Sequence, residues 1–129
     1  MLTISQAAKE TGLSVKSIRY YEQIGLTAPP PRSENDYRYY PSALIKRLHF
    51  IKKTKDAGFS LKESKELLAL SENSERKSAD VKALLSHKIE ELQTKINREQ
   101  ALLENLKNIT EKCCGDDQPN CPIIDEFVN

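Results

Sequence analysis

Residues 3–21, with the sequence TISQAAKETGLSVKSIRYY, decide the fold of this chain. Thr3 followed by Gln6 is a capping box, which predicts the start of a helix, and Gly12 predicts its end. Ser14 then predicts the N-cap of a second helix. Two short helices joined by a glycine-containing turn predict a helix-turn-helix motif.

The exposed side of this second helix carries side chains that can read DNA. They are Lys16, Ser17, Arg19 and Tyr20. Arg and Lys can donate hydrogen bonds to guanine edges or phosphates, and a tyrosine hydroxyl can hold a phosphate. Residues 1–60 carry ten Lys/Arg against five Asp/Glu, a net charge of +5, whereas residues 61–129 have a net charge of −4. An ordinary helical hairpin with solvated charges remains the alternative.

The next segment predicts a wing, a β-hairpin that grips the DNA backbone. Residues 28–31 (APPP) forbid a helix. In residues 32–40 (RSENDYRYY), the turn signal Asn35-Asp36 lies between aromatic and charged residues, which favours two short strands. The expected phosphate contacts are Arg32, Tyr37 and Arg38.

Two further helices complete the head. One begins near Pro41 and ends at Gly58, and the other begins at a second capping box that starts with Ser60. We expect these two helices to form a hairpin that braces the reading helix. The DNA-binding head therefore spans residues 1–71, and the polar residues 72–78 form a hinge.

A helical pattern without Gly or Pro occupies residues 79–112 and makes the fold mainly α. Leu85, Ile89, Leu92 and Ile96 recur at spacings of four, three and four, as in the a/d seam of a coiled coil. Such a helix is roughly 50 Å long, so one small head cannot bury its seam. The seam needs an antiparallel or parallel partner helix, most simply from a second copy of the chain. The fold that we predict has a long antiparallel coiled coil, which gives a homodimer on pseudo-palindromic double-stranded DNA. The alternative is a helix packed on its own head.

All three cysteines lie in residues 113–121 (CCGDDQPNC). Two thiolates, from Cys113 and Cys121, suit a soft monovalent ion such as Cu(I), because a structural zinc site takes four ligands and an iron–sulfur cluster usually needs four cysteines. A Cys113–Cys121 disulfide, or a divalent site completed by a partner chain or water, stays open. Residues 113–129 thus form a metal-binding loop and a short docking segment. We expect that Cys114 is not a ligand of the metal.

Composition and motifs exclude other classes. No apolar run is long enough to span a bilayer, and residues 1–6 do not start a signal peptide. We therefore expect a cytoplasmic protein with no membrane partner, in which clustered thiols stay reduced. The sequence shows no nucleophile–base pair, phosphate loop or paired carboxylates in a pocket-forming context, so we do not expect an enzyme.

The order of these elements and several motifs resemble the MerR family of transcription regulators. Residues 18–22 (IRYYE) look like that family's recognition helix, and residues 32–38 (RSENDYR) look like its wing. Residues 78–82 (SADVK) and residues 113–124 are similar to the copper-efflux-regulator (CueR) branch. The sequence departs from the family's pattern at two positions. Asp36 replaces the usual glycine of the wing turn, and Cys114 takes the place of an expected proline.

The resemblance implies a Cu(I)-responsive activator. Cys113 and Cys121 would hold Cu(I), Ag(I) or Au(I) in a nearly linear pair. Ser78 stands where divalent-metal members place a cysteine of the partner subunit, so the site would stay two-coordinate, and Lys82 would offset its negative charge. The bound dimer would bend and untwist a promoter with an over-long spacer, so that RNA polymerase engages both promoter elements and copper-efflux genes are switched on.

Overall fold

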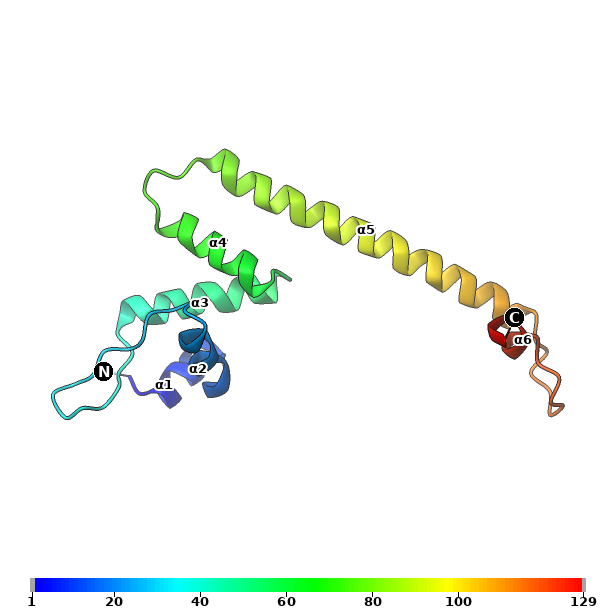
Figure 1. The fold of residues 1–129 in the computed structure, drawn as a ribbon, viewed down its shortest axis with the longest axis horizontal. Helices are drawn as coiled ribbons and strands as arrows, with labels where there is room; N and C mark the ends of the chain where they lie inside the picture. Colours follow the sequence, from blue (N-terminus) through cyan, green and yellow to red (C-terminus); the bar gives the residue numbers. More distant parts are fainter. Residues whose placement is uncertain (1, 129) are drawn as a thin grey trace. The chain divides into compact units, whose positions relative to one another are not determined.

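The computed structural model describes residues 2–128, which are mainly helical, as the sequence predicts (Figure 1). The helices are α1 (Ile4–Thr11), α2 (Val15–Gln23), α3 (Ser42–Asp56), α4 (Leu61–Glu72), α5 (Ser78–Glu111) and α6 (Pro122–Val128). The chain divides into two compact units, one ending at Val81 and the other beginning at Lys82. Within residues 2–128, no helix combines the length and the apolar character that a membrane span requires.

The ends of the first helices are set locally, by the capping residues that the sequence indicates. The Gln6 N–H donates to Thr3 Oγ1 at 3.2 Å, and the Thr3 N–H donates to Gln6 Oε1 at 2.8 Å. Ser60 and Glu63 form the same reciprocal pair at the start of α4. Gly12 ends α1 with φ +77°, a left-handed conformation that glycine adopts without strain.

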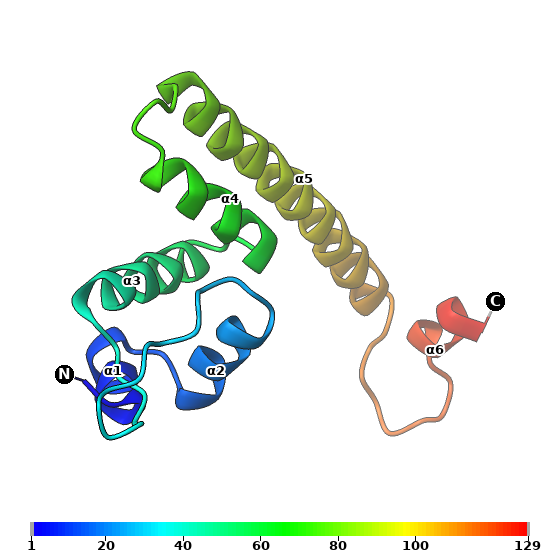
Figure 2. The same cartoon turned by 60° about the vertical axis from the view of Figure 1, so that its left-hand side comes forward.

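The first unit has its own core around α3. Figures 1 and 2 show α1 and α2 on one side of α3 and α4 on the other. Ala7, Ile18, Leu48 and Ile51 are completely buried in this core. Ile45 is buried in the same core. The predicted bracing hairpin of α3 and α4 is therefore present.

The wing is a hairpin, but the prediction of two short strands is wrong. Among the described residues it pairs only through the isolated bridge of Arg32 with Arg38, and a second bridge joins Leu2 to Tyr40. The Tyr39 N–H donates to the carbonyl of Pro31 at 3.0 Å. Pro31 has no N–H to donate in return, so the ladder cannot extend past this point.

The turn of the wing accommodates its unusual residue. The Asp36 N–H donates to Ser33 O at 2.9 Å and the Ser33 N–H donates to Tyr37 O at 2.8 Å, which closes a three-residue loop. Asp36 has φ +65° and is the one non-glycine residue of the described chain with positive φ. Aspartate tolerates this conformation better than most residues, so the hairpin forms without the glycine.

The second unit contains most of α5, a continuous helix of 34 residues. The predicted helix over 79–112 differs from it by one residue at each end. Its predicted seam is exposed, with Leu85 at 42%, Ile89 at 64%, Leu92 at 42% and Ile96 at 59% of their full accessibility. A short loop after α5 leads to α6.

Candidate metal centre and nucleic-acid interface

Two helix ends bring Cys113 and Cys121 together. The Cys113 N–H donates to Thr110 O at 3.1 Å, which continues the last turn of α5, and the Asp125 N–H donates to Cys121 O at 3.1 Å, which starts α6. Gly115, with φ +69°, lets the intervening loop turn back. The two Sγ atoms lie 3.9 Å apart, and both residues are half-buried free cysteines.

The environment of Cys121 favours its thiolate. The backbone N–H of Ile124 has the largest effect and holds the pKa of the Cys121 thiol below its usual value. The N–H of Ile123 and the Cys113 thiol act in the same direction, against the effects of burial and of the Asp125 charge. Because the thiolate is the form that binds metal ions, these backbone groups prepare Cys121 as a ligand.

The donor set fits a soft ion held by two sulfurs. With a sulfur–metal distance of about 2.3 Å, one ion can contact two sulfurs up to about 4.6 Å apart. The observed 3.9 Å lies within that limit but is shorter than a linear pair requires, so the two sulfurs would have to move apart to hold an ion linearly. Within residues 2–128, no group of three or more His, Cys, Asp or Glu side chains is arranged to hold a metal. The chain itself therefore offers two thiols at this place and no third ligand from those residue types.

Cys114 is turned to a different partner. Its Sγ donates to Asp116 Oδ2 at 3.1 Å, and the Gln118 N–H donates to Asp116 Oδ1 at 3.0 Å. The bond from Cys114, followed by that from Gln118, lowers the pKa of the Asp116 carboxyl. Asp116 is thus a turn-forming residue, and Cys114 is exposed and engaged away from the sulfur pair.

Ser78 and Lys82 lie at the opposite end of α5 from the cysteines. They are one helical turn apart and both exposed. At 1.5 Å per residue, Lys82 and Cys113 are separated by roughly 45 Å along the helix. Only Ser78 and Lys82 of a partner subunit could approach this chain's sulfur pair, so their role in selectivity stays a prediction.

The reading face of α2 is open to solvent. Lys16, Arg19 and Tyr20 are exposed, with Tyr20 at 47%. Ser17 is half-buried, and its Oγ accepts a hydrogen bond from Ser14 Oγ at 2.9 Å. Ile18 and Tyr21 anchor the opposite face in the core. The structure thus brings the three longer predicted side chains to one open face, and their contact with DNA stays a prediction.

The three predicted wing contacts differ in their surroundings. Tyr37 is 75% exposed. Arg32 pairs with Asp36, with Nη1 3.4 Å from Oδ1, and both partners belong to the wing. Arg38 instead reaches α2, where its Nη1 lies 3.6 Å from Oε2 of Glu22.

Sequence reasoning missed the roles of Glu22 and Tyr40. Tyr40 is 2% exposed and donates its hydroxyl hydrogen to Glu22 Oε1 at 2.7 Å. Burial, followed by this bond to the Glu22 carboxylate, raises the pKa of Tyr40. A signal was present in the sequence, because Glu22 is four residues after the buried Ile18 and therefore lies on the core side of α2, where an acid needs partners.

The fold, with α1 and α2 joined at Gly12 and the outer face of α2 open to solvent, defines a helix-turn-helix protein. The family model described as MerR HTH family regulatory protein matches residues 2–71, and the model described as MerR, DNA binding matches residues 45–109. The chain therefore belongs to the MerR family. The expectation of a DNA-binding transcription regulator rather than an enzyme is confirmed.

Named relatives cover almost the whole chain. Heavy metal-dependent transcription regulator 2 of Rhizobium meliloti (strain 1021) is 45% identical over 99% of this chain and 87% of its own length. The HTH-type transcriptional regulator CueR of Salmonella typhimurium is 42% identical over 98% of this chain and 91% of its own length. The solved structure of the regulator PbrR691 from Ralstonia metallidurans CH34, in complex with lead(II), superposes with a TM-score of 0.88 at 29% identity, covering 98% of this chain and 99% of that one.

Proposed function

We propose that this protein is a homodimeric, Cu(I)-responsive transcription activator of the cytoplasm that switches on copper-efflux genes. It would stay on its promoter with or without metal. The metal-bound dimer would bend and untwist an over-long spacer, so that RNA polymerase engages both promoter elements. Ag(I) and Au(I) would fit the same two sulfurs.

The observation that carries this proposal is the isolated pair of thiols. Cys113 and Cys121 approach within 3.9 Å, and Cys114 is held by Asp116. Soft thiolates select Cu(I), and an ion of low charge is satisfied by two of them. Ser78 of the partner subunit would stand nearby as a hydroxyl, a poor ligand for a soft ion. The resemblance to a CueR regulator supports the same choice of metal.

The exposed seam of α5 supports the homodimer. Four apolar side chains at coiled-coil spacing, from Leu85 to Ile96, are 42% to 64% accessible in the single chain. A second copy of α5, packed antiparallel, would bury this stripe and place two reading heads on a pseudo-palindromic site. The same arrangement would bring the partner's Ser78 and Lys82 to the sulfur pair.

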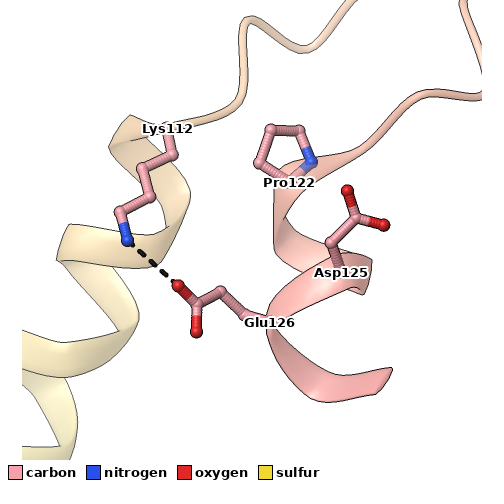
Figure 3. Close-up of a pocket in the computed structure, with 4 residues that line it drawn as sticks. All are labelled: Lys112, Pro122, Asp125 and Glu126. Atoms are coloured by element: carbon pink, nitrogen blue, oxygen red, sulfur yellow. Dashed lines mark hydrogen bonds and ion pairs between the residues drawn. The ribbon is translucent and has the colours of Figure 1, made fainter. Parts of the chain in front are cut away.

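The loop is connected to the docking segment that would transmit the signal. Figure 3 shows an open pocket lined by Lys112, Pro122, Asp125 and Glu126, in which Lys112 Nζ lies 3.0 Å from Glu126 Oε1. Holding Cys113 and Cys121 on one ion would order the loop and fix the place of α6. Exposed apolar side chains of α6, among them Ile124 at 58% and Phe127 at 67%, could then pack against another surface of the dimer.

The test is an anaerobic titration of the reduced full-length protein with Cu(I) and with Zn²⁺. Binding stoichiometry and transcription from its own promoter are measured for the wild type, Cys113→Ser, Cys121→Ser and the matched control Cys114→Ser. We expect the first two variants to lose the Cu(I) response and keep DNA binding, and Cys114→Ser to behave as the wild type. Loss of the response in Cys114→Ser, or activation of the wild type by Zn²⁺, would contradict the two-thiol site.

A Ser78→Cys arm of the same titration tests the selectivity argument. A thiol in place of the hydroxyl would add a third soft ligand from the partner subunit. We expect Ser78→Cys to gain a response to Hg²⁺ that the wild type lacks. An unchanged metal range would remove Ser78 from the selectivity mechanism.

Two other functions have some support. The relatives include a heavy metal-dependent regulator and a lead(II)-bound regulator, so another metal is one alternative. A response to Zn²⁺, or to Pb²⁺ added in the same titration, without a response to Cu(I) would favour it. A thiol-redox sensor is the other, because the free Cys113 and Cys121 sulfurs are neighbours at 3.9 Å. Transcription that responds to a mild oxidant with no metal present would favour the redox sensor.

A further inference from the structure

Glu22 joins the reading helix to the wing. It lies in the last turn of α2, and its side chain is only 9% exposed. Its two oxygens have different partners, since Oε1 accepts the hydroxyl hydrogen of Tyr40 at 2.7 Å and Oε2 lies 3.6 Å from Nη1 of Arg38. Both partners come from the strand-like segment that leads out of the wing.

This carboxylate cannot easily leave its place. An ionised carboxylate is costly to bury unless it is paired, and Glu22 is paired on both oxygens. Tyr40 is itself buried at 2% exposure, so withdrawal of Glu22 would leave the hydroxyl of Tyr40 without its partner. The position of Glu22 is therefore set by the core and not by solvent.

Arg38 pairs with Glu22, but much of its side chain remains exposed to solvent. Its side chain is 54% exposed, and its ion pair with Glu22 leaves N–H groups of the guanidinium for another acceptor. A DNA phosphate is such an acceptor, because guanidinium groups bind phosphate oxygens. The ion pair thus ties a cation that we predict to contact DNA to a residue of α2.

The second arginine of the wing is held differently. Arg32 pairs with Asp36, and the two side chains are 53% and 83% exposed. Both residues belong to the wing, so this ion pair does not fix the position of the wing relative to α2. Between these two wing arginines, Arg38 is the one tied to the reading helix.

We propose that Glu22 is a positioning residue that sets the register between the wing's phosphate contact and the base contacts of α2. This inference rests on the proposed DNA-reading function and deepens it. Phosphate contacts position a protein on DNA, and base contacts supply the sequence information. When Arg38 is held in place, the phosphate contact of the wing and the base contacts of α2 can form together on the correct sequence. The negative charge of Glu22 also weakens the attraction to DNA of any sequence.

The test compares full-length Glu22→Gln with Asp36→Asn, which removes the same charge from the other arginine pair. The probes are a duplex selected from a random pool by the wild-type protein and a scrambled duplex of equal composition, each titrated over a series of salt concentrations. For Glu22→Gln we expect the ratio of the two affinities to fall about tenfold, because binding to the selected duplex weakens and binding to the scramble does not. For Asp36→Asn we expect both affinities to rise by a similar factor, with the ratio unchanged.

Arg38→Gln, alone and combined with Glu22→Gln, shows whether Glu22 acts through Arg38. We expect the double variant to show the same ratio of the two affinities as Arg38→Gln, because Glu22 has nothing to position once the guanidinium is gone. Additive losses in the double variant, or equal changes on both duplexes in Glu22→Gln, would overturn the inference. Parallel weakening on both duplexes with a lower melting temperature would likewise reduce Glu22 to a structural residue. Wild-type protein that selects no duplex would instead overturn the DNA-reading function itself.

Discussion

Apolar side chains are buried in the head but exposed along the seam of α5. In the head, Ile18, Leu48 and Ile51 are completely buried. On α5, Ile89 and Ile96 stand at 64% and 59% exposure, although they are the same kind of residue at equally regular spacing. In the head, helices on both sides of α3 cover its apolar faces, whereas the seam of α5 is exposed. The comparison teaches that the core of the head closes within one chain, whereas the exposed seam of α5 would be buried by the second copy that we propose.

The largest expected effect is the loss of the dimer when the seam of α5 is charged. Ile89→Glu combined with Ile96→Glu places two carboxylates where a second α5 would bury them, and unpaired buried charges are strongly unfavourable. We expect the variant to sediment as a single chain at concentrations where the wild type sediments as two. Thr94→Glu with Ala101→Glu adds the same charge away from the seam and should remain dimeric. If both double variants behave alike, the exposed stripe is not the dimer interface.

The next effect concerns the head alone. All five tyrosines lie between Tyr20 and Tyr40, so tyrosine fluorescence reports on this unit. Ile51→Ala removes a fully buried side chain and should lower the free energy of unfolding by about 2 to 5 kcal/mol in a urea titration. Ile89→Ala, at an exposed position of α5, should leave the tyrosine signal unchanged. A similar shift in both variants would show that the head and the long helix unfold as one unit.

The smallest effect is expected in the wing, the part of the head with little core. Asp36 has φ +65°, a conformation that costs alanine about 1 kcal/mol or more. Asp36→Ala should therefore lower the free energy of unfolding by about 1 kcal/mol, while Asp36→Gly should be neutral or stabilising. The same urea titration measures both variants. Equal stabilities for the alanine and glycine variants would show that the turn is not held in the left-handed conformation.

Local features could be predicted from the sequence because each depends on neighbouring residues. The capping boxes at Thr3 and Ser60 and the end of α1 at Gly12 involve groups at most four positions apart. The backbone pairing of the wing was harder to predict. It depends on which N–H groups find partners, and Pro31 has no N–H to donate.

The sequence by itself determined the mainly helical fold, the place of the turns, the apolar seam of α5 and the clustering of thiols after it. Only the tertiary structure decided which groups meet. It brought the sulfurs of Cys113 and Cys121 to 3.9 Å, turned Cys114 to Asp116, and tied Glu22 to Arg38. The physical reason is that helix formation follows spacing along the chain, whereas the partner of a thiol or a buried carboxylate is chosen by loop geometry and by the core around it.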